Sequence, residues 1–307
     1  MRHPRYAIIE APSVLGLFPK GVETLPAALL GAGLEQRLDA SRDGLVEPPA
    51  YDPKRDPATG LLNPRGIAEY SLALADAVER ALKHGKFPVV LGGDCSILLG
   101  CLLATRRRGR AGLLFLDGHA DFYQPEAEPN GEAASMELAL VTGRGPERVT
   151  DLEGLGPLVR DEDVVALGRR DARDAEEHGS QRIEDTDIEV MDLAAVRRQG
   201  AAGAAARALE RLGNRALDGF WIHLDADVLD DAIMPAVDYR MPDGLRWEEL
   251  SSILGAAIVS GRALGIDVTI FNPSLDETGA IAPAFVEALA TGLAADFSRL
   301  RVGRVVG

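Results

Sequence analysis

The feature that most constrains the fold of this sequence is the alternation of short apolar runs with longer segments of helical period. The apolar runs are rich in Val, Ile and Leu and cover residues 6–9, 87–91, 111–116, 163–167, 220–224 and 263–268. Each has the length and composition of a buried β-strand. Segments with helical period cover residues 66–84, 96–107, 202–212, 247–260 and 280–293. This alternation predicts an α/β fold in which a mostly parallel sheet carries helices on both faces.

The composition is that of a folded, acidic protein. Hydrophobic residues make up 46% of the chain and charged residues 26%, which argues against a disordered chain. The 33 Lys and Arg against 48 Asp and Glu give a formal net charge of −15, which repels nucleic-acid phosphates and anionic membranes and attracts cations. We therefore expect a small-molecule substrate, with neither nucleic acid nor a membrane as a partner.

Length and cysteine content bound the organisation of the chain. An α/β protein of 307 residues commonly has one core, so we predict a single catalytic domain over residues 1–307. Cys95 and Cys101 lie in one apolar stretch, which is not the pattern of a secreted disulfide framework. Glu10 and Pro12 interrupt the first apolar run, and no run approaches the roughly 20 apolar residues of a membrane span. We expect a cytoplasmic protein.

One internal segment departs from the alternation of strands and helices. Residues 39–64 are dense in Pro, Asp and Gly and show no period. They predict a long surface loop, which is either a solvated connection or part of a functional site.

Two of the predicted strands are followed by clusters of metal-ligand residues. Asp117, His119 and Asp121 follow one strand, and Asp225 and Asp227 follow another. Ligands bind at the carboxyl ends of parallel strands, and residues two apart in extended backbone share a face, so we expect these five side chains to line one pocket. Buried carboxylates require neutralising cations, and oxygen-rich sets with imidazole suit Mn²⁺, Fe²⁺ or Zn²⁺. One such cluster alone is also typical of a polar loop, whereas two favour a metal site.

A third predicted strand ends in the sequence GGDCS. Gly92 and Gly93 permit a tight turn and a close backbone approach at this strand end. Cys95 follows them, and as a thiolate it is a strong soft metal ligand. Cys101 is expected to be a small buried hydrophobe, which is the alternative for any lone cysteine. For Cys95 we favour the ligand.

These motifs together resemble those of the ureohydrolase family, which includes arginase, agmatinase and formiminoglutamase. The resemblance spans about residues 92–293, and the paired D-G-H-A-D and D-A-D motifs are highly specific. It implies the three-layer α/β/α fold of arginases and deacetylases, with two Mn²⁺ ions bridged by a hydroxide that attacks an amidine carbon; Zn²⁺, Fe²⁺ or Ni²⁺ are alternatives. It also implies that Asp117 and Asp225 contact both ions.

The resemblance assigns the remaining ligands as two pairs. Asp121 and Cys95 complete the shell of one ion, and His119 and Asp227 complete that of the other. Asp121 and His119 are the expected catalytic residues, with Asp121 accepting the proton of the attacking water and passing it to the departing amine.

Several positions depart from the family pattern. The family's G-G-D-H-S motif reads G-G-D-C-S here, so Cys95 replaces a histidine ligand. Ala134 stands where arginase has its proton-shuttling histidine, and Ile270 stands where the family has the glutamate that holds the guanidinium. Arg173 falls near the carboxylate that binds the α-amino group of arginine. The changes at Cys95 and Ala134 are similar to those in the Nω-hydroxy-L-arginine amidinohydrolase branch of the family, in D-cycloserine biosynthesis, which keeps the glutamate.

The sequence therefore predicts a binuclear-metal hydrolase of linear C–N bonds. Its expected substrate is a guanidino, N-hydroxyguanidino or related amidine compound, cleaved to urea or hydroxyurea and an amine. Asn130 and Glu132 are the candidate substrate-binding residues, because Asn130 aligns near family residues that hold the substrate carboxylate and Glu132 can recognise a cation. Glu137 lies in the same substrate-side loop and can likewise recognise a cationic group, and for both glutamates the alternative is a solvated charge on a loop. The family includes monomers, trimers and hexamers, so a homo-oligomer is among the expected states.

Three other functions are compatible with the residues. The first is metal-dependent hydrolysis of a formimino compound or another non-guanidine amide. The second is a metal-independent cysteine hydrolase with Cys95 as nucleophile and His119 as base, which gives the paired aspartates no role. The third is a non-catalytic binding protein, which leaves unexplained why every ligand position keeps a competent ligand. His178 and His223 could replace the missing acid, but we expect His223 to be a packed structural histidine and leave both outside the core site.

Overall fold

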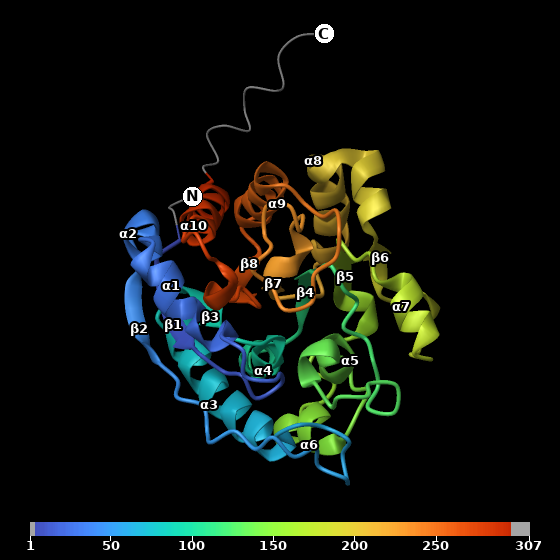
Figure 1. Ribbon diagram of the computed structural model, residues 1–307. Coiled ribbons are helices and arrows are strands. Elements are labelled where there is room, and N and C mark those ends of the chain that lie inside the picture. The colour runs from blue at the N-terminus through green and yellow to red at the C-terminus, as the bar shows by residue number, and fades with distance from the viewer. Residues whose placement is uncertain (1–3, 296–307) are drawn as a thin grey trace, which may run out of the picture.

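The computed structural model describes residues 4–295, except the side chain of Asp174. At its centre lies an eight-stranded sheet in the order β2-β1-β3-β8-β7-β4-β5-β6, and every neighbouring pair is parallel (Figure 1). The strands are β1 (Tyr6–Ala11), β2 (Ser41–Leu45), β3 (Phe87–Gly92), β4 (Ala111–Leu116), β5 (Val164–Leu167), β6 (Glu189–Met191), β7 (Gly219–Asp225) and β8 (Ala263–Thr269). The predicted parallel α/β sheet is confirmed.

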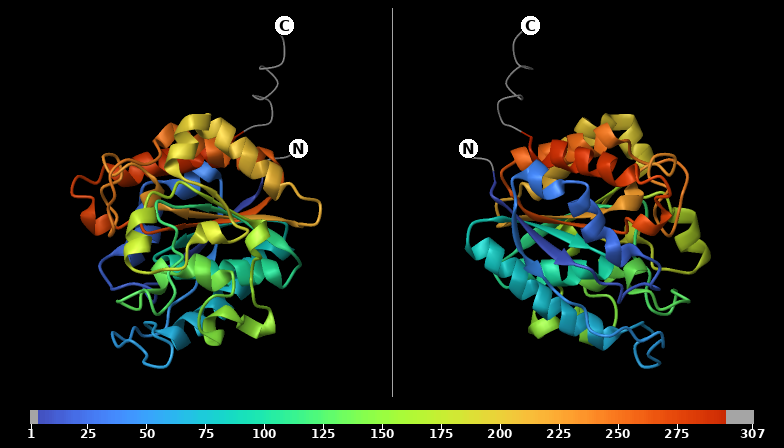
Figure 2. Two further views of the ribbon diagram at one scale, coloured as in Figure 1. Left: turned by 90° about the vertical axis from the view of Figure 1, so that its right-hand side faces the viewer. Right: turned by 60° about the vertical axis from the view of Figure 1, so that its left-hand side comes forward.

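Helices cover both faces of the sheet, as the edge-on views in Figure 2 show. One face packs against α1 (Leu25–Gly31), α2 (Leu34–Leu38), α8 (Leu193–Leu212), α9 (Trp247–Val259) and α10 (Ile281–Leu293). The other packs against α3 (Pro64–Lys83), α4 (Leu98–Arg106), α5 (Glu137–Val141) and α6 (Glu147–Thr150), while α7 (Ala172–Glu177) follows β5. Short 3-10 helices are η1 (Val22–Thr24), η2 (Cys95–Ile97), η3 (Ala133–Ser135), η4 (Leu152–Gly154), η5 (Asp161–Asp163), η6 (Ile183–Asp185), η7 (Ala226–Val228) and η8 (Pro273–Leu275). The predicted three-layer α/β/α arrangement is confirmed.

The central strands are buried on both faces, which explains their continuous apolar sequences. In β4, Leu114 and Leu116 point into the core under α8 and α9, whereas Leu113 and Phe115 point into the core under α3 and α4. Full burial of an aliphatic or aromatic side chain contributes roughly 1.5–3 kcal/mol. The two cores therefore hold the central strands rigidly from both sides.

The expectation that residues 39–64 form one long loop is wrong at its beginning. Ser41–Leu45 form β2, the edge strand, which pairs in parallel with β1. Most residues of β2 are exposed, so neither face supplies the apolar alternation by which a strand is recognised in a sequence. Backbone pairing with β1 and the Lys86–Asp43 ion pair at 2.7 Å hold it in place. Residues 46–63 contain no helix or strand beyond an isolated bridge, as expected.

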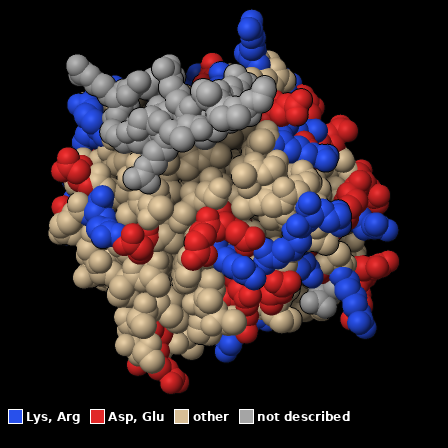
Figure 3. All heavy atoms as spheres, turned by 90° about the horizontal axis from the view of Figure 1, so that it is seen from above, with Lys and Arg blue, Asp and Glu red and all other residues tan. Residues whose placement is uncertain are grey.

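The surface carries acidic and basic side chains beside one another. Figure 3 shows them intermingled on the described part of the face seen from above. One ion pair, Arg197 with Glu249 at 2.6 Å, joins α8 to α9. Among residues 4–295, no helix is both long and apolar enough to cross a membrane.

The strand order explains how distant parts of the sequence meet. β3, β8, β7 and β4 are consecutive neighbours in the sheet, and their registers align Leu91 with Val268, Val268 with Leu224, and Leu224 with Leu116. All four strands end at this level. The segments that follow them are therefore gathered at one rim of the sheet.

Candidate metal centre

The structure brings together all six side chains that the sequence singled out as metal ligands: Cys95, Asp117, His119, Asp121, Asp225 and Asp227. Cys95 Sγ lies 3.0 Å from Asp225 Oδ2, and His119 Nδ1 lies 2.9 Å from Asp227 Oδ2. Potential ligand atoms in sets of three, such as those of Asp117, Asp121 and Asp225, lie within 4.8 Å of one another. His119 is partly exposed and the other five are buried. The five buried side chains would hold metal ions from the protein interior, and the partly exposed His119 marks the side from which a substrate would enter.

Residues 117–121 reach the centre through a turn, so the expectation of extended backbone is wrong here. Asp117 Oδ1 accepts a hydrogen bond from His119 N at 2.6 Å, which closes a tight turn directly after β4. Asp121 has a φ of 41°, a left-handed conformation that Asp tolerates better than most residues. Ala120 N donates to Asp171 Oδ2 at 3.0 Å and fixes the turn from outside. The convergence of the three side chains thus depends on hydrogen bonds beyond the strand.

The second acidic segment is tied both to itself and to the first. Asp225 is the last residue of β7 and caps η7, because its Oδ1 accepts from Asp227 N at 2.7 Å. Asp227 Oδ1 accepts from Gly118 N at 3.1 Å. Arg170 Nη2 donates to the Asp227 carbonyl at 2.8 Å. These bonds hold the two acidic loops together before any ligand is considered.

The GGDCS segment places Cys95 by means of a close backbone approach. A Cβ added to Gly93 would lie 1.8 Å from the carbonyl oxygen of Ser13, so only glycine fits at this position. Asp94 is fully buried and accepts hydrogen bonds from Ser96 N at 2.8 Å and Ser13 Oγ at 3.0 Å. Asp94 therefore starts η2, and Cys95 at the next position faces Asp225.

The carboxylates of the centre oppose one another electrostatically. Burial, followed by the charge of Asp121, raises the pKa of Asp117 well above its usual range. Burial raises the pKa of Asp121, and burial together with the charge of Asp227 raises that of Asp225. Without cations, these groups have to retain protons in the folded protein. Asp117 Oδ2 is also buried without a hydrogen-bond partner among the described residues, and this is an environment that a metal ion would satisfy.

His119 and Asp227 form an ion pair within the centre. Burial alone would lower the pKa of His119, but the charge and the hydrogen bond of Asp227 raise it to about 9. Burial raises the pKa of Asp227, yet the charge and the hydrogen bond of His119 lower it overall. A metal ion at this position would replace the proton between the two groups.

The environment of Cys95 opposes a metal-independent cysteine nucleophile. Burial, together with the charge of Asp225, raises the pKa of the Cys95 thiol well above its usual range. The sulfur contacts Asp225 Oδ2 and Thr269 Oγ1, the latter at 3.1 Å, while His119 is paired with Asp227. A nucleophilic cysteine needs an accessible thiolate beside a base. Coordination to a cation is what would deprotonate this sulfur.

Glu137 also faces the centre, which the sequence analysis did not predict. Its side chain is fully buried, so the alternative of a solvated loop charge is wrong. Its carboxylate oxygens form one ligand-like group with Cys95 and Asp121 and another with Asp117 and His223. The signal that could have revealed it is an acid inside the apolar run MELALV, which forms α5.

His223 is a packed histidine, as expected, but it is also part of this environment. It stacks on Phe115 at 4.8 Å between ring centroids, and its Nδ1 lies 2.5 Å from Asp267 Oδ2. Its Nε2 is buried without a hydrogen-bond partner among the described residues and lies 3.9 Å from Glu137 Oε1. His178, in contrast, lines the cavity beside the centre.

A cavity of about 250 Å³ opens beside the metal-ligand cluster. His119, Asp121, Asp225 and Asp227 border it on one side, and the predicted substrate-binding residues Asn130 and Glu132 also line it. Glu132 is 2% exposed, and its Oε2 accepts hydrogen bonds from Tyr239 Oη at 2.6 Å and Asn130 Nδ2 at 3.3 Å. Its Oε1 is buried with no partner among the described residues. Glu132 therefore brings a buried carboxylate oxygen without a partner among the described residues to the wall of the cavity.

Two positions that depart from the family pattern also line this cavity. Ala134 and Ile270 contribute apolar wall. Ile270 has a φ of 68°, which is rare for a β-branched side chain and is strained by a few kcal/mol at most. Its N–H donates to the Gly93 carbonyl at 2.9 Å. Ile270 is thus held against the GGDCS turn, and its side chain provides no charge for a substrate in the cavity.

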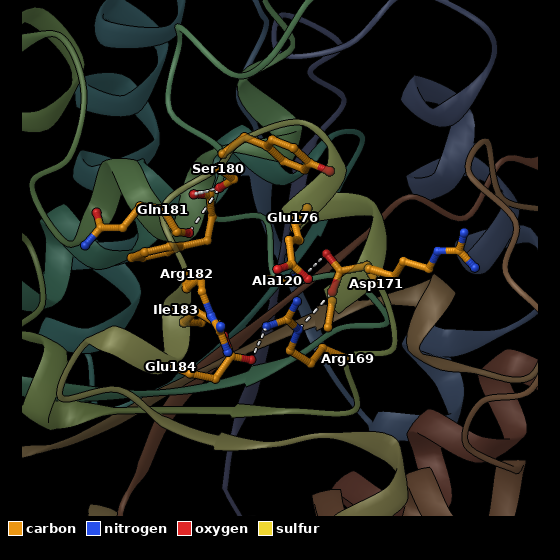
Figure 4. A pocket seen from close by; sticks show the side chains of 14 residues that line it. Ala120, Arg169, Asp171, Glu176, Ser180, Gln181, Arg182, Ile183 and Glu184 are labelled. Atoms are coloured by element: carbon orange, nitrogen blue, oxygen red, sulfur yellow. Dashed lines mark hydrogen bonds and ion pairs between the residues drawn. The ribbon is translucent and has the colours of Figure 1, made fainter.

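Arg173 lines a second cavity, of about 220 Å³, and does not line the first. In this second cavity Arg169 lies between two carboxylates, with Nε 2.8 Å from Asp171 Oδ1 and Nη1 2.7 Å from Glu184 Oε1 (Figure 4). Asp171 also accepts the hydrogen bond from Ala120 N through its Oδ2. This ion pair therefore supports the turn that carries His119, and Arg173 stays away from the cluster.

Comparison with known proteins agrees with this geometry. The model of the arginase family matches residues 5–294. The chain is 30% identical over 292 residues to arginase of Staphylococcus aureus (strain COL), covering 92% of this chain and 95% of that one. It is 31% identical over 296 residues to arginase of Bacillus caldovelox, covering 92% and 97%.

Solved structures show the same relationship. Arginase from Bacillus caldovelox superposes with a TM-score of 0.87 at 28% identity, covering 96% of this chain and 99% of that chain. Proclavaminate amidino hydrolase from Streptomyces clavuligerus shares the fold, with a TM-score of 0.69 at 19% identity and coverage of 95% and 92%. The chain belongs to the arginase family and is a metal-dependent hydrolase of the class that acts on linear amidines.

Proposed function

We propose that this protein is a dimanganese amidinohydrolase that converts a guanidino or N-hydroxyguanidino compound to urea or hydroxyurea and an amine. The observation that carries the proposal is the convergence of six ligand-type side chains on one buried cluster. Four of them are carboxylates, and such an oxygen-rich set favours Mn²⁺, with Zn²⁺, Fe²⁺ and Ni²⁺ as alternatives. Two divalent ions bound there would supply an activated water and stabilise the charge of the tetrahedral carbon.

Each side chain has a role in this proposal. Asp117 and Asp225 lie between the other ligands and would contact both ions, which is consistent with the unpartnered Oδ2 of Asp117. Asp121 and Cys95 would complete the coordination shell of one ion, because the ligand atoms of each lie within 4.8 Å of those of Asp225 and of Glu137. His119 and Asp227 would complete the other shell, where their ion pair now stands. Asp121 also borders the cavity, so it could accept a proton from water and pass it to the amine.

Ile270 favours an N-hydroxylated guanidine over an unmodified one. A guanidinium ion placed against Ile270 would meet an apolar wall and would lose hydration without gaining a counter-charge. Hydroxylation of a guanidine nitrogen lowers its basicity, so the substrate can enter as a neutral group. The substitution of a family carboxylate by Ile270 therefore favours a substrate group that is neutral when bound, and an N-hydroxyguanidino group meets this requirement more readily than a guanidinium does.

Glu132 and Asn130 would hold the other end of the substrate. The free Oε1 of Glu132 is a suitable partner for a substrate ammonium, and Tyr239 and Asn130 hold the carboxylate by its second oxygen. Asn130 can also contact a substrate carboxylate, because it lines the same cavity. An α-amino acid with a guanidino-type side chain has both of these groups.

The proposal is tested by turnover of a panel of guanidino, N-hydroxyguanidino, ureido and formimino compounds. The protein is loaded with Mn²⁺, and release of urea, hydroxyurea, formamide or ammonia is measured against a chelator-treated control. We expect the N-hydroxyguanidino amino acids to have the highest kcat/KM. Turnover of formimino compounds alone would favour the non-guanidine alternative. If the guanidino and N-hydroxyguanidino compounds are both inert, the amidinohydrolase assignment is wrong.

A further inference from the structure

We propose that Glu137 is a seventh protein ligand of the metal centre and that His223, held by Asp267, orients it. The inference rests on the proposed two-metal function and adds a residue to the cluster of six. No motif of the sequence analysis assigned such a role to Glu137, and the structure supplies three independent observations for it.

The first observation is the position of Glu137. It is the first residue of α5, and its carboxylate lies within 4.8 Å of ligand atoms of Cys95 and Asp121 on one side. On another side it lies within the same distance of Asp117 and His223. Cys95, Asp121 and Asp117 are ligands of the proposed centre. Glu137 therefore stands between ligands that come from two different strand ends.

The second observation is the lack of any other partner. Glu137 is fully buried, and among the described residues its carboxylate oxygens have no partner other than the neighbouring acid Asp121, with which they would have to share a proton. Leaving a buried carboxylate unpaired is among the most unfavourable arrangements in a folded protein. The charge of Asp117 opposes it further. A cation is the one kind of partner that satisfies Glu137 and its acidic neighbours together.

The third observation is the support behind Glu137. Asp267 accepts a hydrogen bond from Trp221 Nε1 at 2.5 Å and lies 2.5 Å from His223 Nδ1. This fixes the ring of His223 so that its Nε2 faces Glu137 Oε1 at 3.9 Å. Partners behind a metal ligand commonly fix its orientation, and here they follow one another in the order Asp267, His223, Glu137. His223 is thus a positioning residue, which acts on the metals through Glu137.

The test is the affinity for Mn²⁺, measured by titration calorimetry with Glu137→Gln, which keeps the shape of the side chain. We expect wild-type protein to bind two ions and the variant to bind at least one of them on the order of 100-fold more weakly, since even supporting residues contribute 10–100-fold. Glu132→Gln is the matched control, because Glu132 is also a buried acid of the cavity but belongs to no ligand-like group. Its metal affinity should equal that of the wild type.

Thermal unfolding with and without Mn²⁺ separates a ligand from a structural residue. Removing one of several mutually repelling carboxylates should leave the Tm of the metal-free protein unchanged or higher. The increase in Tm caused by Mn²⁺ should be smaller in Glu137→Gln, because a 100-fold loss of affinity removes about 2.8 kcal/mol of ligand stabilisation. A variant that is destabilised equally with and without metal would show a structural role and overturn the proposal.

The role of His223 is tested in two backgrounds. His223→Gln alone should weaken Mn²⁺ binding by about 10-fold. In the Glu137→Gln background the same substitution should have no further effect, since it acts through Glu137. Two ions bound equally tightly by wild type and Glu137→Gln would refute the inference and leave the proposed function intact. Wild-type protein that binds no Mn²⁺ would refute both.

Discussion

The crowding of carboxylates at the rim of the sheet should make the metal-free protein less stable as the pH rises from 6 to 8. Burial raises the pKa of Asp117, Asp121 and Asp225 above their ordinary value of 3.8, so the folded state keeps protons that the unfolded state has already released. Stability is then lost as the pH rises from about 4 towards the raised pKa values. The pKa of His119, raised from 6.5 to about 9, acts in the same direction, since its stabilising proton is lost through this range.

The magnitude follows from the number of protons retained on folding. One proton held by the folded state alone changes the free energy of unfolding by about 1.4 kcal/mol per pH unit, or roughly 2.7 kcal/mol between pH 6 and 8. The proton of His119, whose pKa is raised from 6.5 to about 9, gives a decline of roughly 2 kcal/mol between pH 6 and 8, and any proton that the carboxylates retain in this range adds to it. The lowered pKa of Asp227 adds nothing here, because its carboxylate is ionised in both states throughout this range. Such a decline is an appreciable part of the roughly 5–15 kcal/mol that stabilise a typical domain.

The assay is urea unfolding of chelator-treated protein at pH 6, 7 and 8, followed by circular dichroism. A parallel series in saturating Mn²⁺ should lack the decline, because metal binding releases the same protons and becomes tighter as the pH rises. Metal-free stability that stays flat or rises between pH 6 and 8 would show that the buried acids do not repel one another as described. The reasoning about the cluster would then be refuted.

Three further predictions follow from single residues. Cys95→His should keep two bound ions and measurable turnover, whereas Cys95→Ser should weaken binding of one ion by on the order of 10–100-fold. The thiolate-to-metal absorption of the Co²⁺-loaded wild type should be lost in both variants. If the wild type lacks this absorption, sulfur does not coordinate the metal. Glu132→Gln should raise KM for an ammonium-bearing substrate by about 10–100-fold with little change in kcat, since a charged hydrogen bond contributes roughly 1.5–3 kcal/mol; steady-state kinetics that show only a lower kcat would contradict this. Gly93→Ala should lower the free energy of unfolding by about 3 kcal/mol or more because of the 1.8 Å contact with Ser13, while Gly203→Ala, whose added Cβ meets only Gln199 at 3.3 Å, should be neutral or stabilising in the same urea experiment.

The sheet was predictable from sequence where burial determines the pattern. Strands such as β4 and β7 are buried on both faces and read as continuous apolar runs. β2 was not predictable, because it is an exposed edge strand, and the residues that hold it, those of β1 and Lys86, are distant in the sequence. β6 has three residues, too few to show a period, and the first turns of α8 precede the Ala-rich stretch that indicated the helix.

The candidate site was predictable in its residues and less so in its geometry. Spacing after one strand indicated that Asp117, His119 and Asp121 converge, but the turn that includes the left-handed Asp121 is held by a hydrogen bond from Ala120 to Asp171 in another loop. Glu137 was not placed, because an acid inside the apolar run MELALV indicates a buried position but not that the start of α5 packs under the rim. Long-range packing decides whether an acid on a connecting segment is solvated or buried.

The gathering of β3, β7 and β4 at one rim has a consequence for how the protein matures. No single strand end supplies more than three of the six clustered ligands, and over a hundred residues of chain separate the end of β4 from the start of β7. A nascent chain that has emerged only through β4 therefore cannot form the complete cage. Metal binding must therefore follow assembly of the central strands. The supply of metal would then determine how long the folded protein resists proteolysis, and it would have little influence on the rate of folding.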